Sequence, residues 1–177
     1  MNKAIETLYN EHDIIKSAVG ITDSLKALRE QNPEAYEAKV RELIVFLRGF
    51  ADEFHHYKEE IVLFPEMSKK HEMLEGGILR EMFDNHEEFR EMLRNIESRL
   101  DNKEYEKAQK QLETYVNMLL DHIAVENDEV FQIAETLFNE SELENIGFRF
   151  QDVDREIGEE KKIVLLKLAD EIEKING

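Results

Sequence analysis

Hydrophobic residues recur every three or four positions along most of the chain, which is the spacing of one buried face on an α-helix. This periodicity predicts four long helices, at about residues 3–30, 34–64, 78–100 and 103–139. Pro33 follows the first segment, Pro65 ends the second, and Gly76 and Gly77 precede the third. Four amphipathic helices joined by short connections favour an all-α, up-down-up-down four-helix bundle.

The segment 140–177 is predicted to add further helices to a bundle formed by residues 1–139. Ser141 and Glu144 have the spacing of a capping box, which predicts a short helix there. A last helix, over about 159–175, carries one clean apolar stripe made of Leu165, Leu168, Ile172 and Ile175. We expect this stripe to pack on the bundle or on a partner subunit, in which case the C-terminal helix would form a homodimer.

Composition narrows the class of protein. A chain of 177 residues is long enough for one domain with a substantial core, and only 2 prolines and 7 glycines agree with a helical fold. The absence of cysteine excludes disulfides, thiolate ligands and iron–sulfur clusters, so that His, Asp and Glu remain as strong metal ligands. A net charge of −18 argues against nucleic acid and anionic membranes as partners.

Targeting and membrane signals are the next consideration. No apolar stretch approaches the roughly 18 residues that a membrane-spanning helix needs. The N-terminal residues also lack a basic segment followed by an apolar run, so we expect a cytoplasmic protein.

Two segments repeat one arrangement of candidate metal ligands. His55 precedes Glu59 by four residues, His122 precedes Glu126 by four residues, and a phenylalanine follows each histidine at nine residues. A four-residue step brings both side chains onto one helix face, one turn apart, so that both can point at the same ion. Imidazole nitrogen together with bridging carboxylate oxygen is a ligand set that suits redox iron, and manganese less well.

The segment HHYKEE offers two registers for the first of these pairs. His55 and Glu59 align with the apolar face of their helix, whereas His56 and Glu60 align with a mostly polar face. We therefore predict His55 and Glu59 as ligands. His56 and Glu60 are predicted to support the ligands or to lie at the surface.

His12 and His86 also lie on apolar helix stripes. Counted from the helix ends, His12, His55 and His86 lie at similar heights in an antiparallel bundle, at about 1.5 Å per residue. Inward glutamates at the same level would be costly to bury without a counter-charge, so the combination predicts a metal site. His71, in the polar connection 66–77, is predicted at the surface.

Four segments together resemble the hemerythrin-like HHE cation-binding domain family in their order and spacing: NEHDII, HHYKEEIVLFP, GGILREMFDNH and DHIAVENDEVF. The resemblance covers almost the whole chain. It implies two non-haem irons, with an oxo or hydroxo bridge, held by two bridging carboxylates and four histidines: Glu59, Glu126, His12, His55, His86 and His122.

The resemblance also bears on function. Oxygen-carrying members of that family have a fifth histidine one turn before the one that His86 matches, and Met82 stands at that position here. This departure makes the chain look more like members that act in iron-centre repair and nitric oxide stress. Those members often carry an additional cysteine-containing segment, and this sequence has no cysteine.

An open position on each iron would admit dioxygen, nitric oxide or peroxide. Our first hypothesis is therefore a di-iron protein that binds or senses dioxygen or a related small oxidant. The alternative is a di-iron enzyme of oxidative or nitrosative stress that reduces nitric oxide or peroxide, or repairs iron centres, with Tyr57, Glu60 or Tyr115 as relays. A third hypothesis is a structural protein in which the metal only stabilises the fold.

Overall fold

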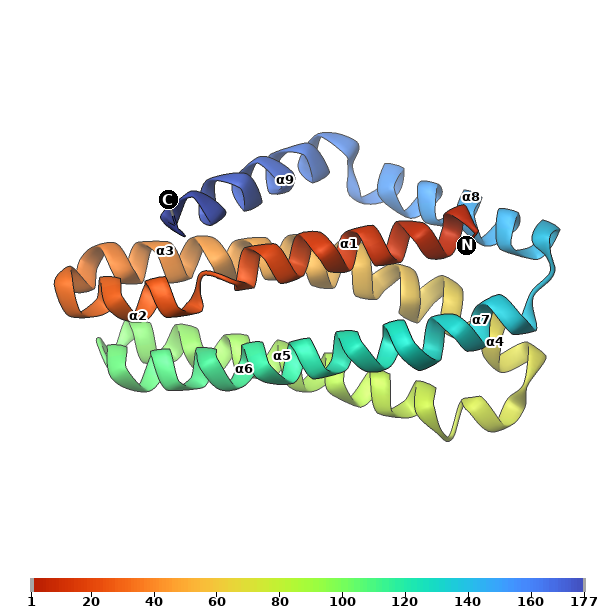
Figure 1. The fold of residues 1–177 in the computed structure, drawn as a ribbon, viewed down its shortest axis with the longest axis horizontal. Coiled ribbons are helices and arrows are strands. Elements are labelled where there is room, and N and C mark those ends of the chain that lie inside the picture. Colours follow the sequence, from red (N-terminus) through yellow and green to blue (C-terminus); the bar gives the residue numbers. More distant parts are fainter. Residues whose placement is uncertain (1, 177) are drawn as a thin grey trace.

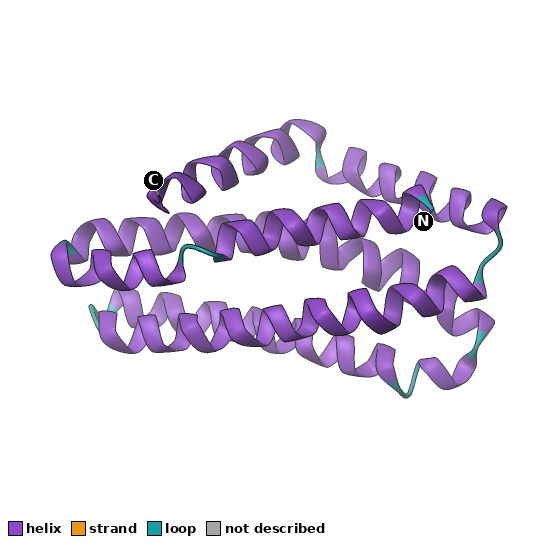
Figure 2. Ribbon diagram, viewed as in Figure 1, coloured by secondary structure: helices purple, strands orange, loops and turns teal. Residues whose placement is uncertain are grey.

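The computed structural model describes residues 2–176, and nearly all of them are helical (Figures 1 and 2). The α-helices, in chain order, are α1 (Lys3–Val19), α2 (Thr22–Gln31), α3 (Pro33–Phe46), α4 (Phe64–Lys70), α5 (Ile78–Asp101), α6 (Tyr105–Val125), α7 (Phe131–Leu137), α8 (Glu140–Ile157) and α9 (Glu159–Glu173). The segments η1 (Leu47–His56), η2 (Glu59–Leu63) and η4 (Glu126–Val130) are π-helical. The segments η3 (Glu72–Leu74) and η5 (Lys174–Asn176) are short 3-10 helices.

Four consecutive rods form a bundle, and rods that follow one another in the chain run in opposite directions (Figure 1). The first rod is α1 with α2, the second runs from α3 to α4, the third is α5, and the fourth runs from α6 to α7. The predicted all-α bundle is confirmed. The chain then turns back, so that α8 and α9 lie along α1 and α3 (Figure 1).

Buried apolar side chains form two clusters, and the buried histidines lie between them along each rod. On α1, Leu8 belongs to one cluster and Ile15 to the other, with His12 between them. On α5, His86 lies in the same way between Met82 and Phe89. The polar level is therefore enclosed by apolar layers on both sides.

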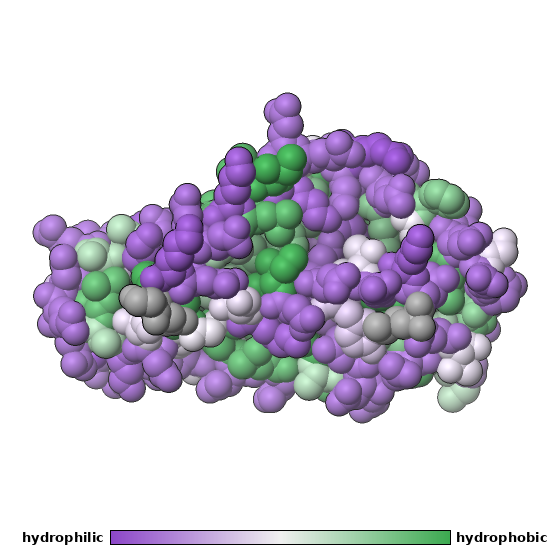
Figure 3. Space-filling view, turned by 45° about the horizontal axis from the view of Figure 1, so that its top comes forward, coloured by the Kyte–Doolittle hydropathy of each residue, from purple (hydrophilic) through white to green (hydrophobic). Residues whose placement is uncertain are grey.

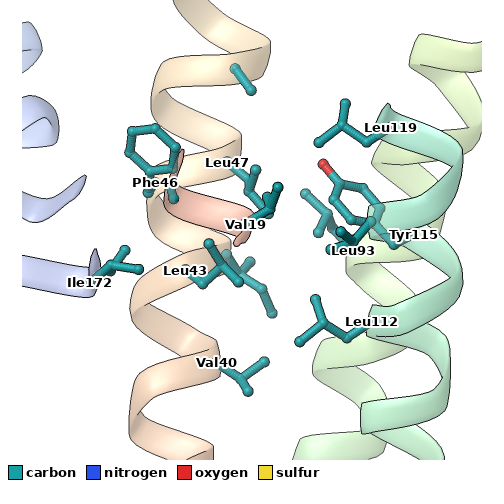
Figure 4. Packing of buried hydrophobic residues seen from close by; sticks show 14 of the residues in the cluster. Val19, Val40, Leu43, Phe46, Leu47, Leu93, Leu112, Tyr115, Leu119 and Ile172 are labelled. Atoms are coloured by element: carbon teal, nitrogen blue, oxygen red, sulfur yellow. The ribbon is translucent and has the colours of Figure 1, made fainter. Parts of the chain in front are cut away.

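The larger cluster shows how the rods pack. Val40, Leu43 and Leu47 of the second rod face Leu112 and Leu119 of α6 across the bundle (Figure 4). All five side chains are buried. Full burial stabilises each such side chain by about 1.5–3 kcal/mol relative to exposure, so this layer fixes the spacing of the helices that carry the histidines.

The first predicted helix, residues 3–30, is interrupted at Gly20 and Ile21. The Gly20 N–H bonds to the carbonyl oxygens three and four residues earlier, α1 ends there, and α2 begins at Thr22. Glycine is a poor helix former, which explains why the helix is interrupted at this point. The resulting turn directs Ile21 into the core, where its side chain is fully buried.

The prediction that Pro65 ends the second rod was wrong. The rod continues through α4 to Lys70, and Pro65 lies in the first turn of α4. Proline is tolerated there because the N–H groups of a first helical turn have no partner within the helix. The connection to α5 therefore begins at His71, whose side chain is exposed, as predicted.

The capping box of α8 lies two residues before the predicted one. The Asn139 side chain accepts from the Glu142 N–H, and the Glu142 side chain accepts from the Asn139 N–H, both at 3.0 Å. Asn139 has the extended backbone of an N-cap, whereas Ser141 already lies in the first turn.

The apolar stripe of α9 packs on the bundle of the same chain. Leu165 and Ile172 are buried in the larger cluster. A Cβ atom added at Gly49 of η1 would lie 2.7 Å from Leu165 Cδ2, so this glycine allows α9 a close approach to the second rod.

The face of the molecule in Figure 3 is mainly hydrophilic, with one apolar band near its middle. The exposed large apolar side chains include Val45 of α3 and Ile163 and Val164 of α9. None of the helices within residues 2–176 has both the length and the apolar character of a membrane span.

Substitution of Leu165 tests the packing of α9. We expect Leu165→Ala to lower the free energy of unfolding by about 2–4 kcal/mol, because it removes a buried side chain and leaves a cavity against Gly49. Val164→Ala, at the exposed neighbouring position, should change it by no more than about 0.5 kcal/mol. Urea unfolding of both variants measures the difference, and equal values would mean that α9 does not pack as described.

Candidate metal centre

Two π-helical turns shape the centre. The Phe64 N–H donates to the Glu59 carbonyl oxygen in η2, and the Phe131 N–H donates to the Glu126 carbonyl oxygen in η4. Each candidate glutamate thus opens a π-turn, four residues after a histidine. Such turns are rare and recur at functional sites. The repeated spacing of His, Glu and Phe in the sequence therefore corresponds to one repeated local structure.

A first group of candidate ligands consists of His12, His55, Glu59 and Glu126. All four are buried, and their ligand atoms lie within 4.8 Å of one another. His12 Nε2 is 3.1 Å from Glu126 Oε2, and His55 Nε2 is 3.4 Å from Glu59 Oε1. A cation among them would meet imidazole nitrogens and carboxylate oxygens, a donor set that suits divalent transition metals.

A second group consists of His56, His86 and His122, whose ligand atoms also lie within 4.8 Å of one another. The Nε2 atoms of His86 and His122 are 3.1 Å apart. The His56 ring stacks on the His86 ring, with 3.8 Å between their centroids. Three buried imidazoles thus converge beside the first group.

The two carboxylates lie between these groups. The oxygen of Glu59 that does not face His55, Oε2, is 3.6 Å from His86 Nε2. The oxygen of Glu126 that does not face His12, Oε1, is 3.3 Å from His122 Nε2. Each carboxylate therefore turns one oxygen toward each histidine group, which is the disposition of a bridge between two cations.

Each of the five histidines also has a polar neighbour at its other ring nitrogen, Nδ1. The Nδ1 contacts are His12 with Asn127 Oδ1 (2.8 Å), His55 with Glu11 Oε2 (3.1 Å), His56 with Asp52 Oδ1 (3.4 Å), His86 with Glu60 Oε1 (2.8 Å) and His122 with the Asn85 side-chain amide (3.3 Å). A contact to an oxygen orients a metal-binding imidazole and selects the tautomer that leaves Nε2 free for the ion, and this applies to His12, His55, His56 and His86. At His122 the facing atom is the amide nitrogen of Asn85, a donor, so this contact orients the ring without selecting that tautomer.

His56 does not lie at the surface, which was one of the two roles predicted for it. His56 is 3% exposed and joins the second group, although the α-helical register had assigned it to a polar face. The register failed because His55 and His56 end the π-helix η1. A π-turn holds more residues than an α-turn, so neighbouring residues lie closer in angle and both can face inward. Glu60 supports His86, within the role predicted for it.

The two central carboxylates have opposite pKa shifts. Burial and the charge of Glu126 raise the pKa of Glu59 well above its usual range. Burial alone would also raise the pKa of Glu126, but His122 and His12 hold it well below its usual range. Burial and the neighbouring His12 lower the pKa of His55 to about 4, so its ring is neutral at pH 7. A cation would displace the proton of Glu59, because bound ligands are deprotonated.

The buried polar atoms at the centre fit a metal. The atoms His12 Nε2 and His55 Nε2, and both carboxylate oxygens of Glu59 and Glu126, make no hydrogen bond to any described residue. Leaving so many buried polar atoms unpaired would be costly in an apolar interior. Cations coordinated by these atoms would compensate all of them at once.

The remaining candidate residues lie around the centre. Met82 is fully buried in the smaller apolar cluster. Of the predicted relays, Tyr57 is exposed, whereas Tyr115 is buried and contacts Phe89, edge to face. Phe89 in turn contacts His122, so Tyr115 lies one residue removed from the second group.

Several supporting residues were not predicted. Glu11 and Asn127 are direct chain neighbours of His12 and Glu126, and adjacency to a ligand is the one signal that could have indicated them. Asp52 lies four residues before His56, the spacing that brings two side chains together on a helix. Asn85, which contacts His122 from another rod, is likewise the chain neighbour of a predicted ligand, His86.

Glu59 and Glu60 are neighbours whose replacement should have opposite effects on the metal-free protein. The raised pKa of Glu59 means that its charged form is disfavoured by folding, so this residue costs stability as the pH rises above 4.5. Glu59→Gln should therefore raise the melting temperature at pH 7, with a smaller gain toward pH 4.

Burial alone would raise the pKa of Glu60, but hydrogen bonds from His86 and Arg90 hold it below 4.5, so its charge stabilises the fold at pH 7. This contribution is lost as the pH falls through the folded-state pKa. Glu60→Gln should lower the melting temperature at pH 7. Thermal unfolding of both variants after chelation of metal measures the direction of each change in melting temperature. A lower melting temperature for Glu59→Gln would contradict the raised pKa assigned to Glu59.

Comparison with known proteins agrees with this arrangement. The model of the hemerythrin HHE cation-binding domain matches residues 3–134, from α1 into α7, and so includes both groups of candidate ligands. No curated protein and no solved structure matches the chain. The chain, with its helical bundle and its convergent histidines and glutamates, belongs to the hemerythrin HHE cation-binding domain family.

Proposed function

We propose that the chain holds a non-haem di-iron centre and uses it to bind or sense dioxygen or a related small oxidant. The proposed ligands are the two bridging carboxylates and the histidines of both groups: Glu59, Glu126, His12, His55, His56, His86 and His122. This set contains the six predicted ligands and adds His56.

The observation that carries the proposal is the orientation of the two carboxylates. Each has one oxygen toward the His12–His55 pair and one toward the His86–His122 pair. A single ion would need only one such group. Two groups that share two carboxylates, with nitrogen donors on both sides, favour a pair of irons over a single structural zinc.

The protein would contribute orientation and exclusion of water. All seven proposed ligands are buried, and the contacts at Nδ1 keep the five imidazoles directed inward. Iron bound there would supply reversible one-electron chemistry and coordination positions for a small oxidant. His86 is held by Glu60, which Arg90 binds at 2.7 Å, so the second group has a charged support that extends toward solvent.

The second candidate function is an enzyme of oxidative or nitrosative stress. A pocket of about 210 Å³ favours it, because its lining includes His56 together with Phe89 and Tyr115. Arg48, Arg90 and Arg94 also line this pocket. An opening at the second group would admit peroxide or nitric oxide with their accompanying solvent, and the Tyr115 hydroxyl could serve there as a proton donor.

Metal content tests the ligand set. The protein isolated from iron-replete cells should hold about two irons per chain, because the donor atoms exceed what one ion can use. His56→Ala should retain about one iron firmly, since it removes one of three donors from the second group. His71→Ala, a matched change at an exposed histidine, should retain both. Elemental analysis decides, and two irons in His56→Ala would remove His56 from the set.

Absorption spectroscopy tests the function. The anaerobically reduced protein should change its visible spectrum when dioxygen is admitted. Recovery of the first spectrum on removal of dioxygen would support binding or sensing, and sustained consumption of peroxide or nitric oxide with a reductant would support the enzyme. A spectrum unaffected by all three molecules would contradict both candidates.

A further inference from the structure

Lys58 is a fully buried lysine within the segment that carries His55 and Glu59. Its ammonium group binds two carboxylates, Glu11 Oε1 at 2.5 Å and Asp154 Oδ1 at 2.7 Å. Lysine is almost never fully buried unless it is paired, so this position has a specific electrostatic environment. Asp154 belongs to α8, outside the bundle.

A second lysine closes the cluster. Lys162 of α9 binds Asp154 Oδ2 at 2.6 Å and Glu11 Oε1 at 3.1 Å. Two ammonium groups and two carboxylates therefore alternate, and both ammonium groups lie near the face of Phe54, at 5.9 Å for Lys58 and 5.6 Å for Lys162. We refer to Glu11, Lys58, Asp154 and Lys162 as the ionic cluster.

The ionic cluster is connected directly to a proposed ligand. Glu11 uses its other oxygen, Oε2, to contact His55 Nδ1 at 3.1 Å, while His55 Nε2 faces Glu59. The partners of the other four histidines lie within residues 3–134, and the cluster contacts none of them. Among the five buried histidines, only His55 is connected to α8 and α9 through such hydrogen bonds and ion pairs.

The turn between α8 and α9 brings the two outer members of the cluster together. Gly158 lies between Asp154 and Lys162 in the chain, with φ of +122°, a conformation that favours glycine. The Gly158 N–H donates to the Asp154 carbonyl oxygen, and the Lys162 N–H donates to the Gly158 carbonyl oxygen. The last turn of α8, with Asp154, and the first turn of α9, with Lys162, are thus held next to each other and close to Glu11.

We propose that α8 and α9 are a functional part of the metal centre: through Lys58 and Glu11, Asp154 and Lys162 position His55 and set its strength as a ligand. This inference rests on the proposed metal centre. A carboxylate at Nδ1 makes an imidazole a better donor to a cation, and the charges around that carboxylate modulate the effect. The cluster would act on the ion of the first group and leave the second group unaffected.

Two substitutions outside the family domain should have opposite effects. Asp154→Asn removes a negative charge, so Lys58 and Lys162 neutralise Glu11 more fully, and cobalt at one of the two sites should bind about 3–10-fold more weakly. Lys162→Met removes a positive charge beside Glu11 and should strengthen binding at the same site by a similar factor. Lys161→Met, a neighbouring change outside the cluster, should leave both sites unchanged.

The affinities would be measured by titrating the full chain and each variant with Co²⁺. A second readout is the imidazole ¹H–¹⁵N spectrum of the full chain loaded with Zn²⁺, in which the Nδ1–H signal of His55 should shift in Asp154→Asn and Lys162→Met, and those of His86 and His122 should not. A purely structural role would weaken binding in both variants, because each loses an ion pair.

The outcomes separate this inference from the metal centre itself. A chain that binds two cobalt ions, with His55 unaffected by both substitutions or with both variants weakened alike, would overturn the role of α8 and α9 only. A chain that binds fewer than two ions would overturn the di-metal centre and this inference with it.

Discussion

The structure depends on the burial of two carboxylates in the middle of the bundle. Glu59 and Glu126 are fully buried, their four oxygens have no hydrogen-bond partner among the described residues, and apolar clusters enclose them on both sides. Transfer of such a group from water costs several kcal/mol unless a positive charge meets it. Neutral imidazoles such as His55 cannot provide that charge, whereas cations held between the histidines can. The rest of the architecture is suited to holding such cations in place.

The helices meet this requirement through local departures from α-helical geometry and through a layer of supporting contacts. The π-turns that begin at Glu59 and Glu126 direct both carboxylates inward, and the π-helix before them brings His55 and His56 to the interior together. The residues that contact the histidines differ between the two histidine groups. His86 depends on Glu60 within the bundle, while His55 depends on Glu11 and hence on the C-terminal helices. Such inequality would make the two metal positions chemically distinct.

The sequence predicted the parts of the protein that follow a regular period. Hydrophobic spacing indicated the rods, and the repeated four-residue step between histidine and glutamate indicated a metal centre. The sequence did not predict that His56 is buried beside His86. The assignment assumed the 100° per residue of an α-helix, whereas His56 ends a π-helical segment. Nor could the sequence predict the ionic cluster, since Lys58 and Asp154 lie far apart in the chain and each alone is typical of a solvated surface.

X-ray absorption at the iron edge tests the di-iron centre most directly, because it reports the ligands of the metal and any second metal nearby in one measurement. We predict a first shell of mixed nitrogen and oxygen donors together with an iron–iron contribution at about 3–4 Å, the separation typical of two ions that share bridging ligands. A spectrum with no metal–metal contribution from a fully loaded protein would contradict the bridging role of Glu59 and Glu126, and with it the di-iron function.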